Sequence, residues 1–204
     1  MQVPSIDEAE AILEESAERN PGPWVDHSKR VAQAARILAE RLPGLEPEAA
    51  CAMGCLHDVG RRFGVSDMRH AVDGYRFMND LGFRDVARVC LTHSFPYPDI
   101  RCYLGEWDCS EEDVAFVRSY LTAEPYTDYD RLIQVCDALS LPRGFCLLEK
   151  RMVDVALRYG VNEYTARKWE WTLKAQRHFE DAMGRSIYRF LPGVVANTFG
   201  GEAP

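Results

Sequence analysis

The sequence predicts an all-α protein, folded as a single-domain helical bundle over residues 1–204. Apolar residues recur through most of the chain at the three-to-four-residue spacing of an amphipathic helix. No segment alternates apolar and polar residues in the way that a half-buried strand does. Clusters of proline and glycine separate the periodic segments, and none of them is long enough to be a linker between domains.

In the first half of the chain, proline and glycine residues set the ends of the expected helices. We expect the first three helices over residues 6–19, 25 or 26 to about 42, and about 47 to the dipeptide at 57–58. Pro47 suits a first helical turn, where its missing N–H forfeits no hydrogen bond, and Gly60 ends the third helix. A polar segment to residue 67 is followed by expected helices that end at residues 81 and 93.

The second half begins with a long aperiodic segment, residues 94–109, which is rich in proline, glycine and aromatic residues. A loop of that length inside a compact domain is usually a lid or a binding loop. Further helices are expected over residues 111–122, 129–141, 145–159 and 163–183, the first of them with Ser110 and Asp113 as a capping box. The apolar tail, 187–199, is expected to pack on the body or on a second subunit, which leaves a homodimer possible.

Composition excludes several classes of protein. A net charge of −8 argues against a general nucleic-acid binder, which needs a basic surface. No apolar run approaches the roughly 18 residues of a membrane span, so we expect no membrane interaction. The seven cysteines are odd in number, without a Cys-x-x-Cys pair, and are expected to be reduced core residues of a cytoplasmic protein.

The most informative feature is the dipeptide His57-Asp58, which follows an apolar helical segment. Burying an imidazole and a carboxylate costs several kcal/mol unless a partner compensates them, and a divalent metal ion is a natural partner. Three further histidines and one aspartate lie on apolar helical stripes. The candidate metal ligands are therefore His27, His57, Asp58, His70, His93 and Asp137. For a single histidine a satisfied core residue is the better explanation, but four of five in such positions favour one or two ions of iron, manganese, cobalt, nickel or zinc.

The order of these residues resembles the signature of the HD-domain superfamily of metal-dependent phosphohydrolases, over about residues 24–141. The resemblance implies an HD-type bundle, with residues 142–204 as a C-terminal helical extension. It also implies a first metal held by residues 27, 57, 58 and 137. Asp58 would bridge to a second metal completed by His70 and His93.

The function implied is hydrolysis of a phosphoester or phosphoanhydride in a small, nucleotide-like substrate by a metal-activated hydroxide. Asp58 and Arg61 would be the catalytic residues, and Arg61, Arg143 and Lys150 would bind the phosphate. The simpler explanation for each basic residue is a solvated surface charge. We favour it for Arg62, Arg143 and Lys150, and for Arg61 the two explanations are equally good. The alternatives are a mixed-valence di-iron oxygenase on the same ligands and a regulatory module with a structural metal site.

Overall fold

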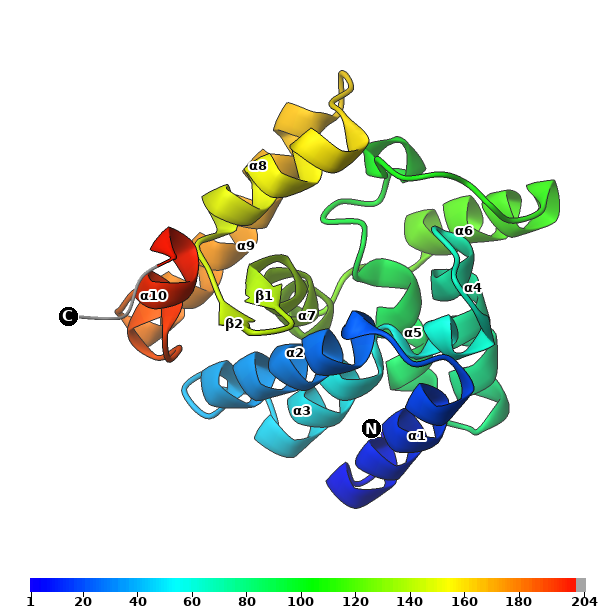
Figure 1. Cartoon of the computed structure of the whole chain (residues 1–204), viewed down its shortest axis with the longest axis horizontal. Coiled ribbons are helices and arrows are strands. Elements are labelled where there is room, and N and C mark those ends of the chain that lie inside the picture. The colour runs from blue at the N-terminus through cyan, green and yellow to red at the C-terminus, as the bar shows by residue number, and fades with distance from the viewer. Residues whose placement is uncertain (201–204) are drawn as a thin grey trace.

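The computed structural model describes residues 1–200, and nearly all of its regular structure is helical (Figure 1). The α-helices in this range are α1 (Ile6–Arg19), α2 (Pro23–Ala39), α3 (Pro47–Leu56), α4 (Arg69–Asp80), α5 (Arg84–Thr92), α6 (Glu111–Ala123), α7 (Asp128–Leu139), α8 (Leu148–Tyr159), α9 (Thr165–Met183) and α10 (Val194–Phe199). Three 3-10 helices, η1 (Val59–Phe63), η2 (Ile100–Cys102) and η3 (Ile187–Arg189), lie between them. The all-α fold class is therefore confirmed.

Helix α7 is the centre of the bundle. Figure 1 shows it near the middle of the molecule, with α8, α9 and α10 along one side and α4, α5 and α6 on the other. It contacts α2, α3, α5, α8 and α9, and its apolar side chains Leu132, Ile133, Val135 and Leu139 are fully buried. A second, smaller core forms where α4, α5 and α6 meet the segment 94–109, around Phe95 and Val117. Both cores leave polar residues of α2, α4, α5 and α7 facing one shared interior region.

The helix boundaries differ from expectation mainly around α8. Residues 140–145 form an antiparallel hairpin of two short strands, β1 (Ser140–Leu141) and β2 (Gly144–Phe145). Gly144 has a φ of 145°, which residues with a side chain rarely adopt. Because the second strand occupies residues 144 and 145, where a helix was expected to begin, α8 begins only at Leu148. The first strand likewise occupies residues 140 and 141, so α7 ends at Leu139 instead of residue 141. Helix α9 begins at Thr165 rather than 163, because the Asn162 side chain accepts the Tyr164 N–H in a turn ahead of it.

No helix in residues 1–200 combines the length and the apolar character that crossing a membrane requires.

Gly60 allows η1 to lie directly against α4. A Cβ built at this glycine would be 1.9 Å from the His70 carbonyl oxygen and 2.5 Å from the Gly74 nitrogen, both backbone atoms. We expect Gly60→Ala to lower the free energy of unfolding by about 3 kcal/mol, because the backbone of one element must move. Urea denaturation measures this. In Gly44→Ala the new Cβ meets nothing within 4 Å, so only the strain of its positive φ remains, about 1 kcal/mol. Equal losses in the two variants would contradict the steric explanation.

Candidate metal centre

All six side chains predicted as metal ligands come together in the interior, from five different helices or their ends. His27 lies on α2, His70 on α4 and Asp137 on α7, while His57 ends α3 and His93 ends α5. Asp58 directly follows His57 at the start of η1. The four histidines and Asp58 are buried, whereas the Asp137 side chain keeps 27% of its surface exposed.

The cluster divides into two groups of three that share Asp58. One group is His27, His57 and Asp58, and the other is Asp58, His70 and His93, with the possible ligand atoms of each group within 4.8 Å of one another. Asp137 adds to the first group. Its Oδ1 lies 2.9 Å from His27 Nε2 and 3.7 Å from His57 Nε2.

The two oxygens of Asp58 face different neighbours. Oδ1 lies 3.0 Å from His70 Nε2 and 3.7 Å from His93 Nε2, while those two imidazole nitrogens are 3.3 Å apart. Oδ2 lies 4.0 Å from His57 Nε2. The carboxylate therefore stands between the two groups, where a bridging ligand would have to stand.

Backbone carbonyls orient three of the histidines. His57 Nδ1 lies 2.8 Å from the Gly54 oxygen and His93 Nδ1 lies 2.9 Å from the Cys90 oxygen. His70 Nδ1 contacts the Asp67 oxygen in the same way. When Nδ1–H donates to a carbonyl, Nε2 is left with its lone pair, and each Nε2 here points into the cluster. This is the arrangement that metal-ligating histidines adopt.

Two buried atoms at the centre have no hydrogen-bond partner, namely His57 Nε2 and Asp58 Oδ1. A buried polar atom without a partner costs about 1–3 kcal/mol, and more when it carries charge. Divalent cations held by the two groups would satisfy both atoms. The set of imidazole nitrogens and carboxylate oxygens without thiolate suits iron, manganese, cobalt, nickel or zinc, so the residues fit the metal that the sequence predicts.

The ionisation states of His93, Asp58 and Asp137 favour the same ligand role. Burial, with neighbouring His57 adding to it, lowers the pKa of His93 to about 3, so this imidazole is neutral at physiological pH. Burial by itself would raise the pKa of Asp58, but Arg61, His70 and His57 outweigh it and hold that pKa well below its ordinary value. The pKa of Asp137 is held low in the same way by His27 and His57. Both carboxylates are thus ionised and able to bind a cation.

The model of the HD domain family matches residues 24–141, which is more than half of the chain and includes all six residues. The chain belongs to the HD domain family. Members of this family are mostly metal-dependent hydrolases. Searches of curated proteins and of solved structures gave no match.

The candidate metal ligands of this HD domain lie beside a cleft of about 600 Å³, and all of them except His57 line its wall. Helix α2, η1, α4, α7, α8 and α9 all contribute to the cleft, together with the segment 94–109. That segment is ordered by two aspartates. Asp67 accepts hydrogen bonds from the Tyr103 hydroxyl and the Glu106 N–H, and Asp108 accepts from the N–H groups of residues 67 and 69. The expected binding loop therefore forms one wall of the cleft.

Arg61 lies on the cleft wall, as expected, but it also contacts a candidate metal ligand. Its Nε donates to Asp58 Oδ2 at 2.7 Å, and its Nη1 donates to the Ser66 carbonyl at 3.3 Å. The side chain remains 30% exposed. Arg61 can therefore hold Asp58 in place and face a substrate at the same time.

The other basic side chains on the cleft wall are not the expected ones. Arg143, in the turn between β1 and β2, and Lys150, on α8, are exposed and do not line the cleft. Arg151 and Arg158 on α8 and Lys168 on α9 line it instead. Arg151 directly follows Lys150, so the choice between them depends on how α8 is rotated against the body, which the sequence pattern did not specify.

Arg62 is not the solvated charge that the sequence suggested. It is buried against α1, where its guanidinium donates to Glu15 Oε1 at 3.1 Å and to Ser16 Oγ at 3.2 Å. Its Cζ also lies 4.0 Å from the centre of the Phe77 ring. Arg62 therefore joins α1 and α4 behind the site and points away from the cleft.

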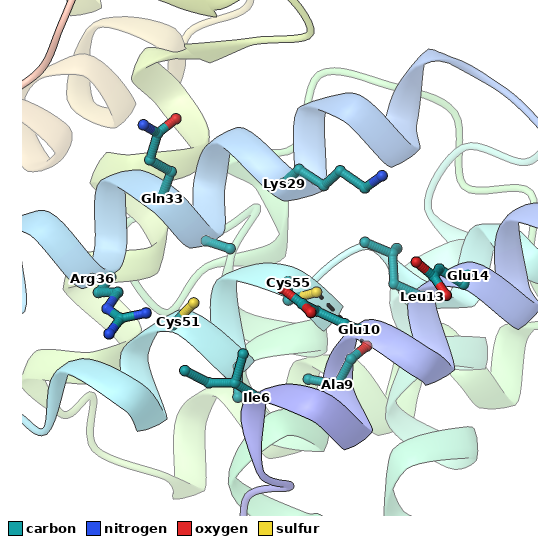
Figure 2. A pocket seen from close by; sticks show the side chains of 12 residues that line it. Ile6, Ala9, Glu10, Leu13, Glu14, Lys29, Gln33, Arg36, Cys51 and Cys55 are labelled. Atoms are coloured by element: carbon teal, nitrogen blue, oxygen red, sulfur yellow. Dashed lines mark hydrogen bonds between the residues drawn. The ribbon is translucent and has the colours of Figure 1, made fainter.

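A separate groove of about 480 Å³ lies between α1, α2 and α3 and contains none of the candidate metal ligands (Figure 2). Figure 2 shows the thiols of Cys51 and Cys55 at its floor, with Cys55 donating to the Ala9 carbonyl. Burial raises the pKa of both thiols, that of Cys55 to about 12. These thiols are protonated at neutral pH, so neither of them is a thiolate nucleophile.

Proposed function

We propose that this HD domain is a metal-dependent phosphohydrolase, which binds one or two divalent transition-metal ions and cleaves a phosphoester or phosphoanhydride bond of a small, nucleotide-like substrate. The observation that carries the proposal is the cleft itself. Five of the six candidate ligands line the same cleft as the cations Arg61, Arg151, Arg158 and Lys168. A metal site beside a basic, open cleft suits a phosphorylated substrate.

The roles of the protein groups follow from their positions. When bound, the metal supplies a hydroxide nucleophile near neutral pH and neutralises phosphoryl charge. Asp58 belongs to both ligand groups and so links them. Arg61 orients Asp58 through the Nε hydrogen bond and presents its remaining donors to the phosphate. Trp24 and Tyr103 line the cleft and offer aromatic surfaces for a base.

The two ligand groups predict that a second metal equivalent, where bound, is held by different residues from the first. We expect His70→Ala and His93→Ala each to remove one equivalent, because both residues belong to only one group, and to leave the His27, His57, Asp58 and Asp137 group filled. Metal content per chain, measured by mass spectrometry after desalting, tests this. His178→Ala is the matched control, since that histidine is exposed and pairs with Asp128 on the surface. Unchanged metal content in all three variants would show that His70 and His93 are core packing residues and do not bind metal.

The decisive experiment on function is elemental analysis of the purified protein, followed by a phosphate-release screen across nucleotides and sugar phosphates with the metal found. Metal-dependent phosphate release from at least one compound class is the expected result. A protein that holds iron, consumes oxygen with an organic substrate and releases no phosphate would overturn the proposal in favour of an oxygenase. A protein that retains no metal would overturn both.

A further inference from the structure

Lys168 is a cation on the cleft wall without a protein partner. It lies in the first turn of α9, and its ammonium makes no hydrogen bond or ion pair with any residue in the described range 1–200. The side chain also lines an adjoining hollow of about 130 Å³, together with His93 and Asp137. Lys168 thus stands where this hollow meets the main cleft, and burial lowers its pKa despite the opposing effect of Cys102 and Asp137. A half-buried ammonium without a protein partner gains from any anion that enters.

Helix α8 adds two guanidinium groups to the same wall. Arg151 and Arg158 both donate to Asp154 Oδ2, at 2.9 Å and 3.2 Å. One carboxylate therefore balances only one of the two arginines. With Lys168, the wall formed by α8 and α9 carries a net positive charge, although the whole chain has a net charge of −8.

The wall of α8 and α9 adds positive charge beyond what the metal centre and Arg61 supply. The metal ligands and Arg61 lie within residues 24–141, the segment that matches the family, whereas Arg151, Arg158 and Lys168 lie beyond it. The negative charge of a scissile phosphate would be met by the metal and Arg61. A second group of cations on another wall of the cleft indicates a second anion in the ligand.

We propose that α8 and α9 form a second anion site, centred on Lys168, so that the substrate carries a further phosphate group besides the one at the metal centre. The inference rests on the proposed function for the first phosphate. It names the substrate class as polyphosphorylated compounds, such as nucleoside polyphosphates or bisphosphates, in preference to simple monophosphates.

Calorimetric titration of the metal-loaded protein with inorganic phosphate and with tripolyphosphate tests the proposal without turnover. Lys168→Met should weaken tripolyphosphate binding roughly tenfold or more, the scale for losing one charge-assisted hydrogen bond, and change phosphate binding less than about twofold. Lys174→Met is the matched control on the same helix, because Lys174 pairs with Glu170 on the surface at 2.8 Å. Arg158→Gln, at a more exposed position on α8, gives a second measurement should Lys168→Met fold poorly.

Selective loss of tripolyphosphate affinity in either cleft variant supports the second site. Equal losses for phosphate and tripolyphosphate, or affinities unchanged in both variants, would overturn it. The outcome is separable from that of the proposed function. Selective binding without hydrolysis of any phosphate ester would leave the anion site standing and remove the phosphohydrolase. Hydrolysis without selective binding would do the reverse.

Discussion

Asp58→Ala is expected to abolish metal binding altogether, because Asp58 is the residue that the two candidate ligand groups share. His27 or His70 serves one group, so its loss leaves the other intact, whereas loss of Asp58 removes a ligand from both. Metal content per chain after desalting should fall from one or two equivalents to none, and phosphate release should fall to background with it. Asp58→Asn, which keeps the shape but not the charge, should retain only weak binding.

A thermal readout makes this prediction independent of activity. A metal that binds only the folded chain at a hundred times its Kd stabilises it by about 2.7 kcal/mol, which raises the Tm by roughly 5–10 °C in a chain of this size. We expect that rise in the unmutated protein and in His178→Ala, and no rise in Asp58→Ala. A metal-dependent rise in the Asp58→Ala variant would place the metal elsewhere.

The candidate histidine ligands could be predicted from the sequence because they are polar residues at positions where the helical pattern calls for apolar ones. Each histidine falls on an apolar helical stripe, where a polar group is costly unless something compensates it. Helical spacing also fixes which face a residue occupies, so His27 on α2 and Asp137 on α7 could be placed in the interior without any tertiary information. The structure brings them to 2.9 Å.

The basic wall could not be predicted in the same way. Helix α8 buries only Leu148 completely and leaves the apolar residues Val153 and Leu157 exposed, so its apolar residues do not all mark the face that docks on the body. Lys150 and Arg151 differ by about 100° around the helix, and only packing decides between them. The hairpin ahead of α8 was missed for a related reason, since strands of two residues, such as Ser140–Leu141, are too short to show an alternating pattern.

The position of Arg62 could not be predicted from the sequence because it depends on contacts with residues far away in the chain. Its neighbours in sequence are Arg61 and an exposed aromatic residue, Phe63, which together suggest a solvated turn. The partners that bury Arg62 lie at Glu15 and Ser16, more than 40 residues earlier in the chain. No local pattern reports a contact with residues that distant.

Arg61→Ala should reduce the rate of phosphate release about 100-fold, the scale for removing one charge-stabilising group, while metal content stays close to that of the parent protein. The reduction has two physical sources. The guanidinium is removed from the cleft wall, and Asp58 Oδ2 loses the Nε–H donor that lies 2.7 Å from it. The metal is retained because helix ends and backbone carbonyls, and not Arg61, fix the histidines around it.

Two further variants separate those sources. Arg61→Lys should restore only part of the rate, because one ammonium cannot reproduce the planar donors that serve Asp58 and a phosphate together. Arg62→Ala is the matched control. It should keep the parent's kcat and KM but lower the Tm, since Arg62 contacts Glu15 and Phe77 and points away from the cleft. Unchanged kinetics in Arg61→Ala would transfer phosphate recognition to the wall of α8 and α9, where Arg151, Arg158 and Lys168 line the same cleft.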